Sequence, residues 1–530
     1  MHFTVLQRPR SLNFVIRILW GIYSLALLAS CTGPSATRPP VPTSFLSKPE
    51  TIAQATKKRT VRREGTSGFE MMADGKEAYL ARLAIVESAQ KTLDFQYFIW
   101  ADDVCGTVFA DRLLAAADRG VKVRMLLDIT HGAQSEVKSA TLAAHPNIEI
   151  AFFNPMTALK GIFAGNPIPI IGEIDRMQSR MHNKILIADK KLLIGGGRNL
   201  ADTYFGVDRK HNMRDLDFIA QGPVVGAANK SFNLYWNSPL TRKGDRTKLT
   251  AKDQDKLQDM RQNIDRKKRH LARHHRYPYP ITLARKDALK ILDELSARMV
   301  WAEYEFIADP PERMLRKGKV ASPVWRTVED AIEGSQKEVV MHAAYLIPQE
   351  ETLALFQETA KRGVKIQLLT NSLASIDGML AMTGIANRRK EILETGADYY
   401  ELNARAPARK DYLHTPKPTP LGMHTKGLVV DDRISFIGSY NMDPRSKYIN
   451  TETGVIINSP TFAARLKSYL REDFRPENCW HVNQEKNNRL TWKGKTQYGQ
   501  PITHQTDPEV PLKKRVSYWL LTHLPWENLL

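Results

Sequence analysis

Cysteine is scarce in this 530-residue sequence, which contains three, at positions 31, 105 and 479. So few thiols exclude a fold built on a disulfide framework, and their surroundings give little support to a cysteine nucleophile. Cys105 and Cys479 could pair in an oxidising compartment, but nothing in the sequence brings them close together. We therefore expect two free thiols at these positions.

Acidic residues are outnumbered in the same sequence. The chain has 57 Asp and Glu against 77 Lys and Arg, which gives a formal net charge of +20. This balance favours a polyanionic partner, either nucleic acid or an anionic membrane surface, and does not choose between them. The length and the ordinary hydrophobic content, 42%, leave room for two or more globular domains.

The apolar run at the N-terminus, residues 18–29, is too short to span a bilayer comfortably. It follows arginines at positions 8, 10 and 17 and ends in Leu-Ala-Ser-Cys at 28–31, which resembles a bacterial lipobox. The resemblance implies a lipoprotein signal peptide over residues 1–30 and lipidation of Cys31; an uncleaved signal-anchor helix is the alternative. We expect a bacterial lipoprotein that faces the periplasm, on the inner or the outer membrane.

The rest of the chain repeats itself. Residues 119–128, RGVKVRMLLD, return about 243 residues later as RGVKIQLLTN, and each copy joins the end of a helical pattern to an apolar strand. Residues 180–199, RMHNKILIADKKLLIGGGRN, return with the same spacing of His, Lys and Asp in GMHTKGLVVDDRISFIGSYN at 422–441. Strands that alternate with helices imply parallel βαβ units, so the sequence predicts a duplicated α/β domain.

This duplication sets the expected domain boundaries. After a flexible tether rich in Pro, Ser and Thr, we expect the following order: tether 31–65, first lobe 66–240, basic linker 241–285, second lobe 286–478 and C-terminal tail 479–530. The basic linker is interpreted as a solvated helix, with phosphate or headgroup binding as the alternative.

Two further segments carry an expectation about lipid. The amphipathic helix of the tail has a composition suited to a membrane interface, and docking against the protein's own core is equally consistent with it. The segment 156–172 is too apolar and too rich in Gly and Pro for an exposed loop. We interpret it as the border of an acyl-chain pocket.

The repeated motif predicts a phosphate-handling site. Alternate strand positions face the same way, so His182 and Lys184 share a face, as do His424 and Lys426. If the halves pack about a pseudo-two-fold axis, both pairs converge. Further hydrogen-bond donors would come from Asn199, Ser439 and Asn441. Concentrated positive charge without a carboxylate cluster suits a phosphate substrate, and two histidines allow a double displacement.

The sequence lacks an Asp, Glu or His set with metal-ligand spacing, so the lysines are expected to neutralise the phosphate charge, without a metal or other cofactor. Asp189 and Asp431 complete the HxKxxxxD pattern, but they stand at odd offsets from their histidines. We interpret both as structural residues of a hairpin turn.

The paired HxKxxxxD motifs resemble those of the phospholipase D superfamily over residues 66–478. Within it, the stretches QYFIWADD, RMHNK, GGRN and RDLDFIAQGPVV are most similar to bacterial cardiolipin synthases of the C class. The resemblance implies a bilobal α/β sandwich with pseudo-two-fold symmetry and the active site between the lobes. One departure is Gly196-Gly197, where the superfamily usually has Gly-Ser.

The resemblance also implies residue roles. It makes His182 the nucleophile that forms a phosphohistidine and His424 the general acid and base. An acidic residue downstream of each motif orients a catalytic histidine in this superfamily. Glu452 fits that position in the second half and Asp215 in the first, with Asp217 as the fallback.

The expected function is a membrane-associated phosphatidyltransferase that makes cardiolipin from phosphatidylglycerol and a second phospholipid. The main alternative is a phospholipase D that passes the same phosphatidyl group to water. A nuclease is less favoured, because the signal sequence and the apolar segment point to lipid. A non-catalytic lipid-binding module would require decayed motifs, and both HxK pairs are intact. The oligomeric state stays open.

Overall fold

The computed structural model describes residues 65–128, 141–155, 178–244, 249–274, 277–315, 320–376 and 378–522. The expected signal peptide with Cys31, nearly all of the tether and the apolar segment 156–172 lie outside these residues. Within the described part of the chain, no helix has both the length and the apolar character needed to cross a membrane.

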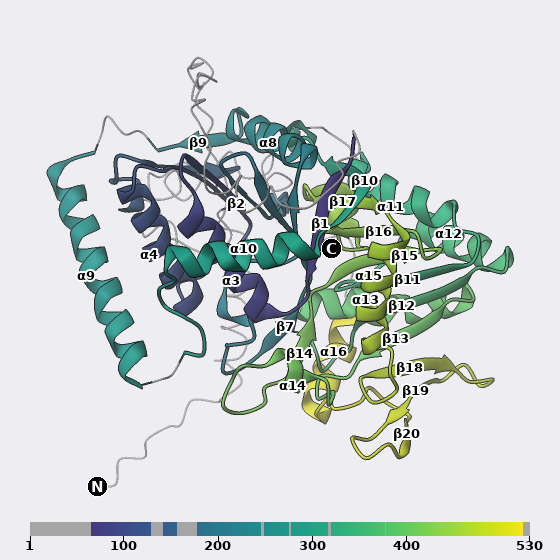
Figure 1. Ribbon diagram of the computed structural model, residues 1–530. Helices are drawn as coiled ribbons and strands as arrows, with labels where there is room; N and C mark the ends of the chain where they lie inside the picture. The colour runs from purple at the N-terminus through teal and green to yellow at the C-terminus, as the bar shows by residue number, and fades with distance from the viewer. Residues whose placement is uncertain are drawn as a thin grey trace, which may run out of the picture.

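The described chain forms two lobes, each built around one mixed sheet (Figure 1). The first-lobe sheet runs in the order β9–β4–β3–β2–β5–β6–β8–β1. Its strands are β1 (Ser67–Met72), β2 (Thr92–Tyr97), β3 (Lys122–Asp128), β4 (Ile148–Phe153), β5 (Ile185–Ala188), β6 (Leu192–Gly196), β8 (Asp217–Gln221) and β9 (Thr241–Lys243).

The second-lobe sheet repeats this order strand for strand, as β18–β13–β12–β11–β15–β16–β17–β10. Its strands are β10 (Val300–Ala308), β11 (Glu338–Ala343), β12 (Lys365–Asn371), β13 (Asp398–Leu402), β15 (Lys426–Val430), β16 (Ile434–Gly438), β17 (Thr453–Asn458) and β18 (Cys479–Gln484). In both sheets three strands are parallel and the remaining pairs are antiparallel. The predicted duplicated α/β fold is confirmed.

Helices cover the sheets at equivalent points of the two repeats. The first lobe carries α3 (Gly75–Ser88), α4 (Val104–Asp118) and α8 (Pro223–Trp236); the second carries α11 (Pro323–Glu333), α12 (Glu350–Lys361), α13 (Met379–Glu394) and α15 (Pro460–Asp473). Gly120 and Gly363 follow α4 and α12 with φ of +94° and +83°. This left-handed conformation is strained for other residues, which explains why both copies of the repeated junction contain Arg-Gly.

The two lobes share a core and a strand pairing. β1 and β10 pair antiparallel, so that Phe69 lies opposite Val300. A short parallel pair, β7 (Asn212–Arg214) with β14 (Leu421–Met423), crosses the interface a second time. One apolar cluster contains residues of both α8 and α15 together with strands of both sheets. The lobes are therefore held in one fixed register.

The packing moves two of the expected boundaries. Helix α10 (Arg285–Arg298), expected to open the second lobe, packs on α3, and its Ala288, Leu292 and Leu295 belong to the first-lobe core. An amphipathic pattern reveals a buried face but not the lobe that covers it. The tail does not stand apart either, since β18 pairs with β13, and β19 (Leu490–Lys495) and β20 (Pro501–His504) extend the same sheet.

The basic linker forms helix α9 (Ala251–His274), which lies along the first lobe beside α4 (Figure 1). Its inner face buries Leu257 and Ile264, and Arg261 and Lys268 pair with Asp118 and Asp111 of α4. The run of charges alone indicated a solvated helix. In the structure the helix is instead docked on the first lobe.

Candidate active site

The two HxK segments lie at the start of two equivalent hairpins, β5–β6 and β15–β16. The apolar strands after each motif, ILIA and GLVV, are fully buried and fix the hairpins within the sheets. Asp189 and Asp431 lie in the turns of these hairpins with φ of +50° and +51°. Their carboxylates are therefore directed at the strand edge rather than at the histidines.

Each of these aspartates anchors its turn to the neighbouring strand. Asp189 accepts hydrogen bonds from the backbone N–H groups at the start of β2, those of Gln90, Lys91 and Thr92, at 2.7–2.9 Å. Asp431 accepts the equivalent three from residues 336–338 before β11, at 2.7–3.0 Å. Both aspartates satisfy backbone donors and stay apart from the histidines.

The histidines bind carboxylates of the opposite lobe. His182 Nδ1 lies 2.8 Å from Glu452 Oε2, and His424 Nδ1 lies 2.6 Å from Asp215 Oδ2. The backbone repeats this exchange, because His182 N–H donates to Thr451 O and His424 N–H donates to the carbonyl of Arg214. The sequence left open which histidine each carboxylate orients. The structure crosses them, so that neither lobe contains a complete histidine–carboxylate pair.

The crossing brings the two imidazoles face to edge. Their ring centroids are 6.5 Å apart, and the rings are inclined at 69°. Lys184 Nζ donates to His182 O and Lys426 Nζ donates to His424 O, both at 2.6 Å. All four side chains are buried, the histidines at 7% and 5% exposure. The structure thus gathers two imidazoles and two ammonium groups in one enclosed, pseudo-symmetric site.

Of the three expected donors, Ser439 contacts Glu452 directly, and Asn441 is linked to it through its backbone N–H and the hydroxyl of Ser446. Ser439 Oγ donates to Glu452 Oε2 and accepts from Thr453 N–H. Ser446 Oγ donates to Glu452 Oε1 and accepts from the backbone N–H of Asn441. These contacts hold the buried carboxylate in place, with Oε2 directed at His182 and Oε1 at Ser446.

Asn199 lies on the other side of the site. Its side-chain amide donates to Tyr204 Oη at 2.9 Å, and its carbonyl accepts from Ile99 N–H at 3.2 Å. The Tyr204 ring in turn packs edge-on against His424 with centroids 5.0 Å apart. Asn199 therefore positions the surroundings of His424 through Tyr204.

Asp217, the fallback carboxylate, does not bind a histidine. It is buried between Arg82 and Arg198 and pairs with both guanidinium groups. Its backbone belongs to β8, which holds it in the first-lobe sheet. The choice of Asp215 over Asp217 therefore follows from their positions relative to β8, because Asp215 lies just before the strand and reaches the interface.

Two aromatic residues of the site were not predicted from the sequence. Phe98 packs edge-on against His182 at 5.1 Å between centroids, and Lys184 Nζ lies 5.3 Å from the Phe98 ring. Tyr204 holds the corresponding place at His424. Phe98 belongs to the QYFIWADD stretch that carries the resemblance, whereas Tyr204 has no signal in the sequence that distinguishes it from a core residue.

Burial sets the protonation of the cationic groups. It lowers the pKa of His182 to about 4, against the opposing charge of Glu452. It also holds the pKa of His424 well below its usual range, helped by the two neighbouring lysines. The pKa of Lys426 falls to about 8 for the same reason, with Asp215 opposing. In the substrate-free site both imidazoles are neutral at pH 7, and an anion that enters would restore positive charge.

The two carboxylates differ. Burial raises the pKa of Asp215 above its usual range despite Lys426 and Arg198. Burial also acts on Glu452, but the hydrogen bond from His182, the charge of Lys184 and the hydrogen bond from Ser439 outweigh it and hold the pKa of Glu452 below its usual range. Glu452 is therefore the firmly anionic partner, and it accepts the Nδ1–H of His182, which leaves the lone pair on Nε2.

The Gly-Gly departure in the first half has a steric basis. A Cβ on Gly197 would come within 2.2 Å of Asp215 Oδ1, where Ser439 in the second half lies beside the longer Glu452. The shorter aspartate brings its own carboxylate into the space that a serine would fill. The first half therefore lacks the serine hydroxyl because the carboxylate of Asp215, from the same lobe, takes up its space.

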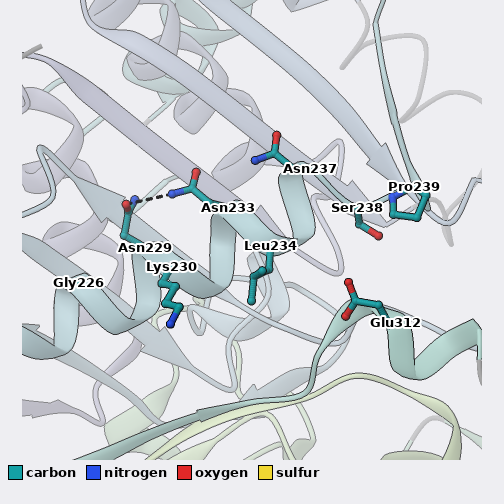
Figure 2. Close-up of a pocket in the computed structure, with 9 residues that line it drawn as sticks. All are labelled: Gly226, Asn229, Lys230, Asn233, Leu234, Asn237, Ser238, Pro239 and Glu312. Carbon is teal, nitrogen blue, oxygen red and sulfur yellow. Dashed lines mark hydrogen bonds between the residues drawn. The ribbon is translucent and has the colours of Figure 1, made fainter. Parts of the chain in front are cut away.

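A surface hollow along α8 lies apart from this site. Figure 2 shows its lining, in which Asn233 donates to Asn229 and Leu234 points into the opening above Glu312. None of the predicted site residues lines this hollow. Its lining is mostly uncharged, with Lys230 and Glu312 as its charged residues, and it contains no histidine.

Comparison with known proteins adds family relationships to this geometry. The family model described as "Cardiolipin synthase, PLD-like domain" matches residues 83–236 and 328–474. Cardiolipin synthase C of Escherichia coli (strain K12) is 31% identical over 476 residues, which cover 88% of this chain and 97% of that protein. Cardiolipin synthase B of Shigella flexneri is 24% identical over 435 residues, 81% of this chain and 85% of that protein.

A solved structure agrees with the fold. Phosphatidylserine synthase of Haemophilus influenzae Rd KW20 superposes with a TM-score of 0.52 and covers 77% of this chain and 86% of that one. The two sequences are 14% identical, so this likeness concerns the fold alone.

Proposed function

Because the chain belongs to the phospholipase D superfamily, in the branch with cardiolipin synthase-like domains, we propose that it is a membrane-associated phosphatidyltransferase that forms cardiolipin. The proposed donor is phosphatidylglycerol and the acceptor is the free hydroxyl of a second phospholipid. One observation carries the proposal: two neutral, buried imidazoles, each oriented by a carboxylate of the other lobe, lie 6.5 Å apart beside two lysines.

The first half of the reaction forms a phosphohistidine. With Nδ1–H donated to Glu452, His182 Nε2 carries a lone pair and attacks the phosphorus of the donor lipid. The P–O bond to the headgroup glycerol breaks, and the leaving oxygen takes a proton from His424. His424 gains that proton as the phosphodiester binds, since the entering negative charge raises its depressed pKa. Lys184 and Lys426 stabilise the charge on the equatorial oxygens.

The second half reverses these roles. His424, now neutral, removes the proton from the acceptor hydroxyl, whose oxygen attacks the phosphorus. The P–N bond to His182 breaks, and the phosphatidyl group leaves on the acceptor. The overall exchange of two phosphatidylglycerol molecules gives one cardiolipin and one glycerol.

Hydrolysis is the second candidate, since water can replace the lipid hydroxyl in the same step. Burial of both histidines, at 7% and 5% exposure, favours transfer, because an enclosed site limits the access of bulk water to the phosphohistidine. The basic net charge of +20 keeps nucleic acid as a third outcome of the test.

The proposal is tested by product analysis. Purified protein is incubated with vesicles that contain labelled phosphatidylglycerol, with the His182→Ala variant as the control. Cardiolipin and free glycerol support transfer. Phosphatidic acid as the sole labelled product would identify a hydrolase, and inert lipid with degraded DNA would identify a nuclease.

A further inference from the structure

The C-terminal helix α16 (Leu512–Thr522) exposes an apolar stripe. Among the described residues seven large apolar side chains are exposed, and three of them lie on this helix: Leu512 at 70%, Val516 at 49% and Leu520 at 57%. Their spacing of four residues places them on one face. The other four are scattered over separate elements, so this stripe is the most concentrated exposed apolar surface in the described part of the chain.

The opposite face of α16 is firmly docked. Tyr518 and Val510, just before the helix, are buried in a cluster with residues of α13 and of two loops, Ile347, Leu373, Ile376, Met382 and Ile385. Lys514 Nζ donates to Leu373 O at 3.0 Å. The helix is therefore fixed to the second lobe (Figure 1), and the exposure of its apolar side chains shows that the stripe faces outward.

The loops under α16 are those that hold the active site. Leu373 and Ile376 follow Asn371, whose side-chain amide donates to Met423 O and accepts from Met423 N–H, directly before His424. Ile347 N–H donates to Met442 O, directly after Asn441. The stripe thus lies at the end of the second lobe that carries the catalytic histidine.

We propose that this stripe inserts into the interface of an anionic phospholipid bilayer and so holds the active-site end of the second lobe at the substrate membrane. The inference rests on the proposed function. Exposed Lys513 stands beside the stripe, and the half-buried Lys514 and Arg515 lie next to it in the first turn of the helix, where they donate to Leu373 O and Thr506 Oγ1. An apolar stripe flanked by bases matches the layering of such an interface, where acyl chains lie beneath anionic phosphates.

The test places an environment-sensitive fluorophore on the stripe of the full chain. Cys105 and Cys479 are buried, so a fluorophore is directed to Val516→Cys, and the unsubstituted chain treated in the same way gives the background from Cys31. The matched control is Tyr498→Cys, at a position 81% exposed on the same lobe. With phosphatidylglycerol vesicles, the label at 516 should shift to shorter wavelength and be quenched at least twofold by lipids with spin-labelled acyl chains. The label at 498 should change in neither way.

Three outcomes would overturn the inference. A label at 516 that stays aqueous means that the stripe does not insert. A blue shift without quenching by the acyl chains means that protein covers the stripe, either the following residues or a second copy. Equal quenching at 498 means general adsorption. The fluorescence readout does not depend on turnover, so a failure of the proposed function can be told apart from a failure of this inference. In that case the label at 516 is quenched by the vesicle lipid, but no lipid product forms.

A second measurement links insertion to catalysis. Leu512, Val516 and Leu520 changed together to Gln should lower turnover of vesicle lipid at least tenfold and leave turnover of a dispersed short-chain phosphatidylglycerol within twofold. The matched triple change at the scattered positions Leu234, Leu315 and Tyr498 should affect neither substrate. Equal loss on both substrates in the α16 variant would contradict the inference, because it would indicate damage to the fold.

Discussion

Glu452 and Asp215 hold equivalent places in the two repeats but have opposite pKa shifts. The difference comes from local contacts. Ser439 and Ser446 donate to Glu452, whereas Gly197 offers no hydroxyl to Asp215. A firmly anionic Glu452 stabilises positive charge on His182 in the phosphohistidine, whose ring carries that charge. The asymmetry is consistent with the division of roles that the superfamily resemblance implies for the two histidines.

Replacement of Gly197 tests this asymmetry. In Gly197→Ser the new Cβ would collide with Asp215 and move it away from His424, so the rate with natural lipid should fall about 10–100-fold, as for other groups that orient a catalytic ligand. An activated ester with a p-nitrophenolate leaving group needs little proton donation and should lose less. Ser439→Ala, the matched variant in the other repeat, acts on Glu452 and His182 and should slow both substrates equally. Full activity of Gly197→Ser would show that Asp215 does not orient His424.

The pH profile tests the lysines. The pKa of Lys426 is lowered to about 8 by burial, so this ammonium is charged below pH 8 and loses its proton as the pH rises. Since kcat/KM reports the free enzyme, it should fall by about tenfold per pH unit above pH 8. Lys426→Arg keeps its charge at higher pH, and its falling limb should move to more alkaline pH even if the maximum is lower. An unchanged falling limb would assign it to another group.

At the scale of elements, the hairpins β5–β6 and β15–β16 position the chemistry. Each is held at its turn by an aspartate that satisfies three backbone N–H groups, and at its open end by the histidine that crosses to the other lobe. The motif name HxKxxxxD therefore joins residues with separate tasks. The histidine and lysine lie in the site between the lobes, and the aspartate fixes the strand that follows them.

Substitution of these aspartates should separate stability from catalysis. Asp189→Ala leaves three backbone N–H donors without their acceptor and places a residue with a Cβ and no local hydrogen bond at positive φ, which should cost about 1–3 kcal/mol of unfolding free energy. Asp189→Asn keeps an acceptor and tolerates this φ, so it should cost less. Asp431→Ala should behave like Asp189→Ala. Denaturant unfolding gives the cost, and turnover per folded molecule should be unchanged. Wild-type stability with lost turnover would show that the aspartate acts in the reaction.

The elements also show what the sequence could predict. The duplication could be predicted from the repeated stretches at 119–128 and 362–371 and from the two HxK motifs, because each repeat keeps the same spacing of strands and helices. The lobe of α10 was not predictable, since its buried face, Leu292 and Leu295, is equally apolar whichever lobe covers it. Phe98 and Tyr204 have no spacing that marks them, and they become part of the site through tertiary contact alone.

At the scale of the whole molecule, the site depends on the register of the two lobes. Each histidine takes its carboxylate from the other lobe, and β1–β10, β7–β14 and the shared core fix the distance between the rings. The sequence predicts that the halves converge but not that they exchange carboxylates, because this pairing arises only from the packing of one lobe on the other. The duplicated chain therefore forms one shared site, in which the proposed mechanism needs one nucleophile and one acid.

The division of labour between the histidines is tested most directly by trapping the covalent intermediate. Wild type, His182→Ala and His424→Ala are mixed with phosphatidylglycerol labelled in its acyl chains or with an activated ester, quenched with base, and counted for protein-bound label. We expect transient label on wild type, none on His182→Ala, and accumulated label on His424→Ala with the activated ester, because no base remains to activate the acceptor. The label should be stable to base and labile to acid.

Label retained on His182→Ala and lost on His424→Ala would reverse the two roles. Turnover without label on any form would contradict the phosphohistidine mechanism itself.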